Sequence, residues 1–278
     1  MTLIQKLLWA LLKIGGGVFA LYLGLIILMY VLQEKLLFLP QPADPQVRRY
    51  LQKYQPHALM TTKTSTGESL QGVFVHGEKK PGPLWIYFGG NAENIDYIVH
   101  EVRHLKDASF VAFNYRGYGD SEGSPSQRAL YQDALHIYDT FSKKEGVDPT
   151  QIYVIGRSLG TGMATYLAAH RKVKKVVLIS PYSSIRDVAQ AHYPFLPVKW
   201  LIRHPFPSDK WAKKVDVPLL CVVAERDQVV PRRFSEALFA AWKGQKSMKL
   251  VKGYDHNSII AAPGHWSTIQ SFLQEDKK

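Results

Sequence analysis

The chain has 278 residues, of which 46% are hydrophobic, and a formal net charge of +12 at pH 7. This length and composition suffice for one large domain with a sizeable hydrophobic core. The positive residues are scattered, without zinc-finger spacing, a basic helix interleaved with aromatic residues or a glycine-rich phosphate loop, so we expect no nucleic acid partner. A basic surface suits anionic lipid headgroups or serves solubility alone, and both interpretations stay open. The single cysteine, Cys221, excludes an internal disulfide and a cysteine-rich metal site.

The N-terminal segment has the composition of a membrane anchor. Residues 14–32 carry no charge, with Lys13 before them and Glu34 and Lys35 after them. A helix needs about 20 apolar residues to cross a bilayer, whereas the apolar region of a cleaved signal peptide has about 7–15 and ends in a small-x-small site. Because this run is longer and lacks such a site, we expect an uncleaved single-pass anchor in residues 1–40 that spans the membrane at about 14–32.

The N-terminal segment also gives expectations for the side of the membrane on which the remaining domain lies and for self-association. Basic residues are fewer before the span than after it, so the positive-inside rule does not favour a cytosolic N-terminus, and long domains translocate largely regardless of charge. We therefore expect the remaining domain on the non-cytosolic side. Gly16, Ala20 and Gly24 fall four residues apart on one helix face, which indicates a weak helix–helix contact in the membrane. Small residues are also common in spanning helices without any such contact.

Residues 41–278 alternate between strand and helix patterns. A proline-rich hinge at 41–46 leaves the anchor. Apolar runs predict strands, and apolar residues at helical spacing predict helices. The strands are expected within 70–76, 83–90, 108–117, 151–156, 174–180, 218–225 and 247–253, and the helices within 93–107, 127–144 and 265–275. Continuous apolar strands separated by helices predict a mostly parallel sheet covered on both faces.

The sequence Gly156-Arg157-Ser158-Leu159-Gly160 stands where a predicted strand gives way to a predicted helix. This is the context that the G-x-S-x-G nucleophile elbow requires. The glycines allow a close backbone approach where a Cβ would collide, and the sharp turn lifts the Ser158 hydroxyl clear of the sheet. A chance G-x-S-x-G at a tight turn is the alternative, which the strand and helix on either side disfavour.

A serine hydroxyl needs a base and an orienting carboxylate to act as a nucleophile, and here they should follow in the order Ser, acid, His. Asp227 follows a predicted strand, and Glu225 is the nearest rival acid. Of the ten histidines, only His256 and His265 lie beyond Asp227, and His256 is in the loop directly after a strand. We therefore predict a triad of Ser158, Asp227 and His256.

An oxyanion hole is also needed, because stabilising the developing charge is usually the largest catalytic contribution. One donor should be the backbone N–H of Leu159, and the second should come from the turn after the strand at 83–88. Within that turn we choose the N–H of Asn91; glycines that serve only the turn are the alternative. The histidines lack the spacing of a metal site and the triad needs no cofactor, so neither a metal nor a cofactor is expected.

Together these motifs resemble the α/β-hydrolase superfamily, and most closely its membrane-anchored abhydrolase domain-containing branch of serine hydrolases, related to prolyl oligopeptidase. The matching segments are FGGNAEN, FNYRGYGDSEGSPSQ, GRSLGTGMA, AERDQVVP and GYDHNS, which with the anchor cover nearly the whole chain. The resemblance implies an α/β-hydrolase fold with the same triad and backbone donors. We interpret Arg116-Gly117-Tyr118-Gly119 as a structural turn, and contact with the substrate is the alternative.

The turn after the strand at 83–88, which we call the oxyanion turn, departs from the pattern of that branch. Gly89 stands in place of the histidine of a His-Gly-Asn-Ala-Gly sequence, and Glu93 stands in place of its second glycine. Phe88 also lacks the hydroxyl that prolyl oligopeptidases supply nearby. The oxyanion hole must then rely on backbone N–H groups.

A long insert at 181–217 separates two predicted strands, and inserts at this place often form a lid over the site. Cations are interspersed there with the aromatic residues Tyr182, Tyr193, Phe195, Trp200, Phe206 and Trp211. The aromatics either wall an acyl pocket while the cations face lipid headgroups, or pack the lid onto the body, and both interpretations stay open.

The function predicted from these features is that of a membrane-anchored serine hydrolase. It would cleave carboxylic esters or thioesters of lipid-like or small acyl substrates through an acyl-enzyme. A serine aminopeptidase of prolyl-oligopeptidase type is the alternative, although the sequence offers no obvious acidic pair to grip a peptide N-terminus. An acyltransferase on the same triad stays open. A non-enzymatic membrane scaffold with a hydrolase fold is disfavoured by the complete triad.

Overall fold

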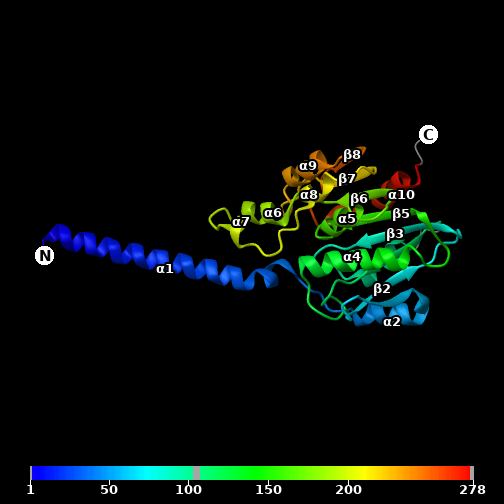
Figure 1. Ribbon diagram of the computed structural model, residues 1–278, viewed down its shortest axis with the longest axis horizontal. Coiled ribbons are helices and arrows are strands. Elements are labelled where there is room, and N and C mark those ends of the chain that lie inside the picture. The colour runs from blue at the N-terminus through cyan, green and yellow to red at the C-terminus, as the bar shows by residue number, and fades with distance from the viewer. Residues whose placement is uncertain (1, 103–106, 276–278) are drawn as a thin grey trace.

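A central eight-stranded sheet organises the molecule in the order β1-β2-β4-β3-β5-β6-β7-β8 (Figure 1). The computed structural model describes residues 2–102 and 107–275. β2 runs antiparallel to β1 and β4, and the other neighbours run parallel. The strands are β1 (Leu59–Lys63), β2 (Ser69–Val75), β3 (Gly82–Phe88), β4 (Ser109–Phe113), β5 (Val147–Arg157), β6 (Lys175–Ile179), β7 (Leu219–Ala224) and β8 (Lys246–Val251). The mostly parallel sheet predicted from the apolar runs is therefore confirmed.

Helices cover both faces of the sheet, as predicted. Side chains alternate between the faces along each strand, so in β3 Leu84 and Ile86 enter one core and Trp85 and Tyr87 enter the other. The first core is shared with α4 (Gln127–Phe141), α5 (Gly160–Ala168), α8 (Ser208–Ala212) and α9 (Arg232–Ala241). The second is shared with α2 (Pro45–Tyr54), α3 (Ile98–Val102) and α10 (His265–Gln274). Short 3-10 turns complete the order at η1 (Pro56–Ala58), η2 (Ile95–Tyr97) and η3 (Ser258–Ala261).

α1 (Leu3–Leu37) is a single 35-residue helix that projects away from the sheet domain (Figure 1). It begins at a capping box, in which the Thr2 hydroxyl accepts from the Gln5 N–H and the Gln5 side chain accepts from the Thr2 N–H. Apolar residues dominate its surface, none of them is buried, and the helix is long and apolar enough to cross a membrane. It extends beyond the predicted span of 14–32 at both ends, because the flanking lysine, glutamine and glutamate residues are good helix formers.

The insert at 181–217 forms α6 (Ile185–His192), α7 (Val198–Leu201) and α8, and α6 and α7 lie beside the C-terminal part of α1 (Figure 1). We call residues 181–217 the lid. Some of its aromatic residues pack the lid onto the body, and others are exposed. Tyr182 and Phe206 are fully buried against the body, whereas Phe195 and Trp200 are exposed, Trp200 by 88%. The lid is therefore packed firmly at its base and presents aromatic surface at its tip.

α2 and β1 are among the elements that were not predicted from the sequence. The predicted hinge at 41–46 overlaps the start of α2, whose N-cap Asp44 accepts from two backbone N–H groups and is followed by a proline at N1. Only Val47 and Leu51 of α2 are buried, so its apolar pattern is too sparse to be recognised. β1 was also missed, because it pairs on one side only, and just one of its five residues, Thr62, is buried. Of the predicted helix at 93–107, η2 and α3 are present, and residues 103–106 lie outside the described residues.

Candidate active site

Ser158 lies at the sharp turn between β5 and α5, with a φ of +47° that a non-glycine residue rarely adopts. The turn is tight on both sides. A Cβ on Gly156 would lie 2.6 Å from the carbonyl oxygen of Gly160, and a Cβ on Gly160 would lie 2.1 Å from that of Phe88. Glycine is therefore required at both positions, for the close approach that the sequence predicted. The Ser158 backbone N–H donates to the carbonyl oxygen of Ile179 at 2.9 Å, which ties the elbow to β6.

The three residues of the predicted triad come together in one hydrogen-bonded row. His256 Nε2 lies 2.7 Å from Ser158 Oγ, and His256 Nδ1 lies 2.8 Å from Asp227 Oδ2. The other carboxylate oxygen of Asp227 accepts the N–H groups of Val229 and Val230 at 3.0 and 2.7 Å. The Asp227 side chain is only 1% exposed and that of His256 8% exposed. A buried carboxylate held in this way fixes the orientation of the imidazole and favours its Nδ1–H tautomer.

The rival residues are placed elsewhere. Glu225 accepts from the backbone N–H of Gly253, and Asp255 accepts from Ser258, so neither carboxylate takes a place in the row. His265 begins α10, and its Nε2 is buried without a partner among the described residues. Burial, and then the nearby Arg157 and Lys249, lower the pKa of His265 to about 4, so this ring stays neutral at pH 7.

The turn after β3 lies directly beside the nucleophile. A Cβ built on Gly90 would lie 3.7 Å from the Ser158 Cβ. Ala92 has a φ of +58°, so this turn also contains a residue in the left-handed region. Among the described residues, the predicted donors, the N–H groups of Asn91 and Leu159, have no protein acceptor. Both amides are therefore available to a ligand.

Glu93, one of the two residues of this turn that depart from the pattern of the resembled branch, holds the turn together. Its Oε2 accepts the Gly90 N–H at 2.7 Å and pairs with Arg157 Nη1 at 2.9 Å, and its Oε1 accepts the Tyr87 hydroxyl at 2.8 Å. The two charged side chains are only 12% and 16% exposed. Burial, and then the Glu93 charge, raise the pKa of Tyr87 well above its usual range, which keeps its hydroxyl a donor. We call Glu93, Arg157 and Tyr87 the turn network.

The sequence marks Glu93 as a departure from the pattern of the resembled branch, but it does not predict the turn network. A signal was present. Glu93 lies in the turn after β3, and Arg157 lies at the end of β5, at the first variable position of G-x-S-x-G. β3 and β5 are neighbouring parallel strands, so their carboxyl ends meet at one edge of the sheet. Opposite charges at such corresponding positions favour an ion pair.

The Asn91 side chain joins the same turn to the end of α1. Its Nδ2 donates to the Leu37 carbonyl at 2.7 Å, and its Oδ1 accepts from the Leu39 N–H at 3.1 Å and from the Tyr118 hydroxyl at 2.7 Å. The sequence predicts a role as oxyanion donor for the backbone N–H of Asn91 and no role for its side chain. The helix predicted as an anchor is therefore bonded directly to the turn that should carry the oxyanion.

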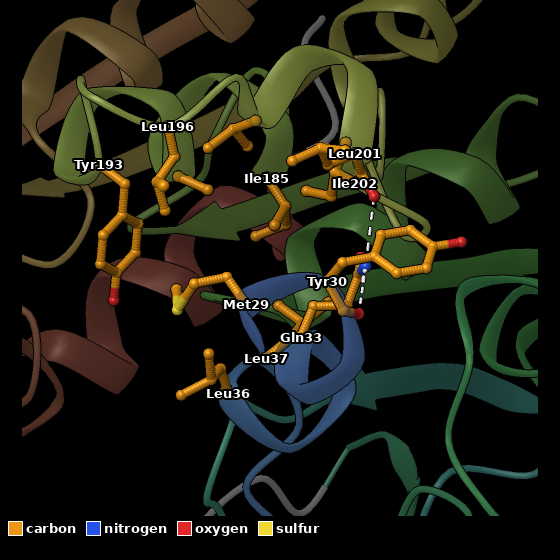
Figure 2. Close-up of a pocket in the computed structure, with 12 residues that line it drawn as sticks. Met29, Tyr30, Gln33, Leu36, Leu37, Ile185, Tyr193, Leu196, Leu201 and Ile202 are labelled. Atoms are coloured by element: carbon orange, nitrogen blue, oxygen red, sulfur yellow. Dashed lines mark hydrogen bonds between the residues drawn. The ribbon is translucent and has the colours of Figure 1, made fainter. Parts of the chain in front are cut away.

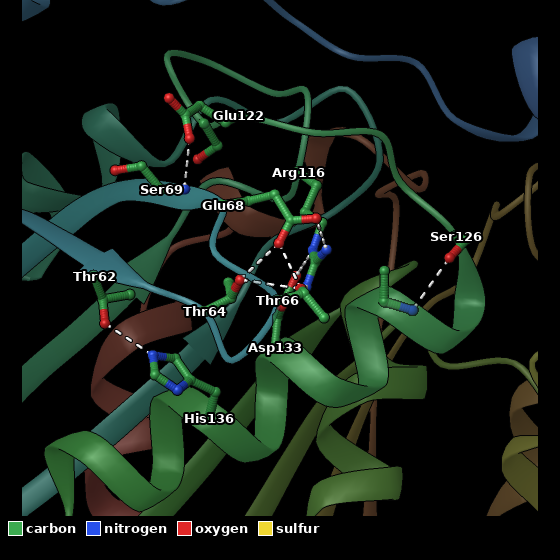
Figure 3. A network of polar contacts seen from close by, with 12 residues as sticks. Thr62, Thr64, Thr66, Glu68, Ser69, Arg116, Glu122, Ser126, Asp133 and His136 are labelled. Carbon is green, nitrogen blue, oxygen red and sulfur yellow. Dashed lines mark hydrogen bonds and ion pairs between the residues drawn. The ribbon is translucent and has the colours of Figure 1, made fainter.

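Arg116 lies in a separate polar cluster (Figure 3). Its guanidinium makes two hydrogen bonds to Asp133 of α4, at 2.7 and 2.8 Å, and one to Glu68 at 2.6 Å. These bonds connect the loop after β4 with the turn between β1 and β2. They support the structural role expected for Arg116.

Two further expectations concern Cys221 and metals. Cys221 is buried in β7, and burial raises the pKa of its thiol to about 12, so it is a small core residue rather than a reactive one. Within residues 2–102 and 107–275, no three His, Cys, Asp or Glu side chains gather as a metal site would require.

Comparison with known proteins identifies the fold of the chain. Residues 83–203 match the family model described as the alpha/beta hydrolase fold. An uncharacterized protein of Mycobacterium tuberculosis is 32% identical over 258 residues, which are 91% of both chains. The lysophosphatidylserine lipase ABHD12 of Rattus norvegicus is 31% identical over 69% of this chain, and the match spans 56% of the length of that lipase.

Solved structures show the same fold at lower identity. An alpha-beta hydrolase from Vibrio vulnificus superposes with a TM-score of 0.68 at 19% identity, over 84% of this chain and 88% of that chain. An acetyl xylan esterase from Paenibacillus superposes with a TM-score of 0.65 at 17% identity, over 87% of this chain and 98% of the esterase. These likenesses extend over the sheet and helices described above.

Proposed function

Because the chain belongs to the α/β-hydrolase family and is a serine hydrolase, we propose that Ser158, His256 and Asp227 form its catalytic triad and act on carboxylic esters or thioesters of lipid-like acyl groups. The observation that carries the proposal is the continuous row Ser158–His256–Asp227 at the elbow, with bonds of 2.7 and 2.8 Å. The lipase and esterase names of the relatives support a hydrolase acting on lipid or ester substrates.

The geometry suits an acyl-enzyme mechanism. Ser158 Oγ attacks the carbonyl carbon while His256 Nε2 takes the hydroxyl proton, and Asp227 stabilises the resulting imidazolium. The N–H groups of Asn91 and Leu159 donate to the oxyanion of the tetrahedral intermediate. His256 then gives the proton to the leaving alcohol or thiol as the C–O or C–S bond breaks. Water, deprotonated by His256, attacks the acyl-enzyme and releases the carboxylic acid together with free Ser158.

Labelling with a fluorophosphonate probe tests the triad. The probe phosphonylates only an activated serine, so wild-type protein in detergent should be labelled, and Ser158→Ala should not. His256→Ala should reduce labelling strongly, because no base remains to take the proton. Ser183→Ala is the matched control, since Ser183 is a buried serine outside the row and should leave labelling unchanged. Well-folded wild-type protein that resists the probe would refute the triad and favour the scaffold alternative.

The choice between ester and peptide substrates needs a separate comparison. Matched p-nitrophenyl esters, acyl thioesters and aminoacyl anilides should be hydrolysed in that order of decreasing kcat/KM. Faster cleavage of the anilides would favour the aminopeptidase alternative. Adding an alcohol acceptor tests the transferase alternative, since ester product formed at the expense of acid would establish acyl transfer.

We also propose that residues 1–40 anchor a catalytic domain of residues 41–278 in the membrane, with the domain on the non-cytosolic side. The length and apolarity of α1 support the anchoring part of this proposal. Alkaline carbonate should leave the protein in the membrane fraction, and protease added to sealed vesicles of known orientation should report the side of the domain. Release by carbonate would overturn anchoring. The stripe of Gly16, Ala20 and Gly24 lies exposed on α1, so weak self-association there stays a prediction.

A further inference from the structure

An apolar pocket of about 170 Å³ lies between the last turns of α1 and the lid (Figure 2). Met29, Leu36 and Leu37 of α1 form one side, and Ile185 and Leu196 of the lid contribute to the other. An apolar cavity of about 150 Å³ is large enough to admit benzene. The pocket can therefore hold about six carbon atoms, and because it is open at the surface a longer chain can extend beyond it.

Polar contacts on the rim hold α1 against the lid, so the pocket is built rather than accidental. Gln33 donates to the Leu201 carbonyl at 3.2 Å and accepts from the Arg203 N–H at 2.7 Å. Glu34 pairs with Arg203 at 3.3 Å and lies 3.2 Å from a ring nitrogen of His204. These bonds leave the apolar side chains of both elements facing a shared space.

Leu37 links the pocket to the proposed catalytic centre. The Leu37 side chain lines the pocket, and its carbonyl accepts the 2.7 Å hydrogen bond from Asn91, whose backbone N–H is a proposed oxyanion donor. One hydrogen bond therefore separates the pocket lining from the turn that carries the proposed oxyanion donor.

The position along α1 places the pocket at the surface of the bilayer. At about 1.5 Å per residue the helix is about 52 Å long, whereas the hydrocarbon core of a bilayer is about 30 Å thick. The apolar run of α1 ends at Leu32, so Met29 lies at the end of the expected span and Leu37 lies beyond it. The exposed Trp200 and the cations Lys199 and Arg203 on the neighbouring lid suit a headgroup layer.

We propose that this pocket binds the acyl chain of a membrane-resident lipid ester, which reaches Ser158 by sliding along α1 from the bilayer. The inference rests on the proposed function and deepens it, because it makes the membrane helix a wall of the substrate site. The occupant follows from the apolar lining, from its continuity with the lipid-facing surface of α1 and from its bond to the oxyanion turn.

The test compares p-nitrophenyl acetate, butyrate and octanoate in detergent micelles. For the wild type, kcat/KM should rise by roughly tenfold for each two methylenes until the pocket is filled. Met29→Trp fills the pocket from α1 and Ala189→Phe fills it from the lid, because both residues line it. Each should lower kcat/KM for octanoate by about tenfold or more relative to kcat/KM for acetate.

Leu28→Trp is the matched control, since it places the same bulk on the adjacent, exposed position of α1 that does not line the pocket. It should preserve the chain-length profile. Equal profiles for Met29→Trp and wild type, or equal loss on acetate and octanoate, would overturn the acyl site. Failure of the proposed function is distinguishable, because wild-type protein would then neither label nor hydrolyse acetate.

Discussion

The turns that follow β3 and β5 lie side by side, yet they are held by different forces. The elbow around Ser158 is fixed by backbone sterics, since a Cβ on Gly156 or Gly160 would collide with a carbonyl oxygen. The turn around Asn91 is fixed by side chains, through the turn network and through the bond of Asn91 to the end of α1. One turn therefore tolerates no added atom, whereas the other depends on charge and hydrogen bonding that distant residues supply.

Gly160→Ala should have the largest effect, because it adds an atom to the elbow that backbone sterics hold in place. The new Cβ would lie 2.1 Å from the Phe88 carbonyl oxygen, so β3 and α5 must separate. We expect a loss of about 3 kcal/mol or more in the free energy of unfolding and loss of fluorophosphonate labelling. Thermal unfolding in detergent and labelling measure both effects. Gly17→Ala, in an open part of α1, should be neutral, and tolerance of Gly160→Ala would refute the steric account.

Glu93→Gln should have the next largest effect, because it removes a charge that holds the turn around Asn91. The variant keeps an acceptor for Gly90 but leaves the nearly buried Arg157 without its counter-charge. A displacement of the turn by a fraction of an ångström should lower kcat/KM for a short ester by about 10- to 100-fold. The double variant Glu93→Gln/Arg157→Gln should recover part of the loss, since no buried charge then stays unpaired. Strict additivity of the two single effects would contradict the coupling.

Asn91→Ala should have a smaller effect, because the backbone donor stays and only its connection to α1 is lost. The Leu37 carbonyl and Leu39 N–H each lose a partner, so we expect a fivefold to tenfold loss, about 1 kcal/mol, in kcat/KM. Tyr118→Phe removes the bond to Asn91 and the bond from the Leu39 N–H, but it leaves both bonds of the Asn91 side chain to Leu37 and Leu39, and it should lose less. Initial rates with acetate esters compare the two, and the reverse ranking would show that α1 does not support this turn.

His265→Gln should have the smallest effect on activity at pH 7, and its effect should be seen in acid stability. The pKa of His265 is about 4 in the folded protein against an ordinary value of 6.5. Between these values the unfolded chain binds a proton that the folded chain does not, so the wild type loses stability as the pH falls, by about 2 kcal/mol at pH 5. The variant should lose less between about pH 7.5 and about pH 5. Equal shifts in thermal midpoint for both proteins would exclude His265 as a cause.

The comparison also explains how far the sequence predicts the site. Backbone sterics leave a local signature, so the glycines around Ser158 and the order of Asp227 and His256 along the chain sufficed to place the row. The turn network leaves none, because Glu93 and Arg157 lie 64 positions apart and meet only when β3 and β5 pair. The Glu93 carboxylate supplies bonds to this turn that a glycine at the same position would not.

The same distinction applies to the fold. The buried parallel strands were predicted because they are apolar throughout, whereas α2 and β1 were missed because few of their residues enter a core. The contact of α1 with the lid joins Gln33 and Leu201, which are 168 residues apart, and no periodicity in either segment indicates it. The acyl pocket between them is therefore a property of tertiary structure alone.

The bond between Leu37 and Asn91 determines what a fragment released from the membrane would retain. A protease that cut the chain after α1 would free the sheet domain from the lipid, but the released fragment would lack both a support of its oxyanion turn and one wall of its acyl pocket. Shedding would thus extinguish the activity rather than export it. Hydrolysis would be confined to the surface in which α1 is embedded, without any separate inhibitor.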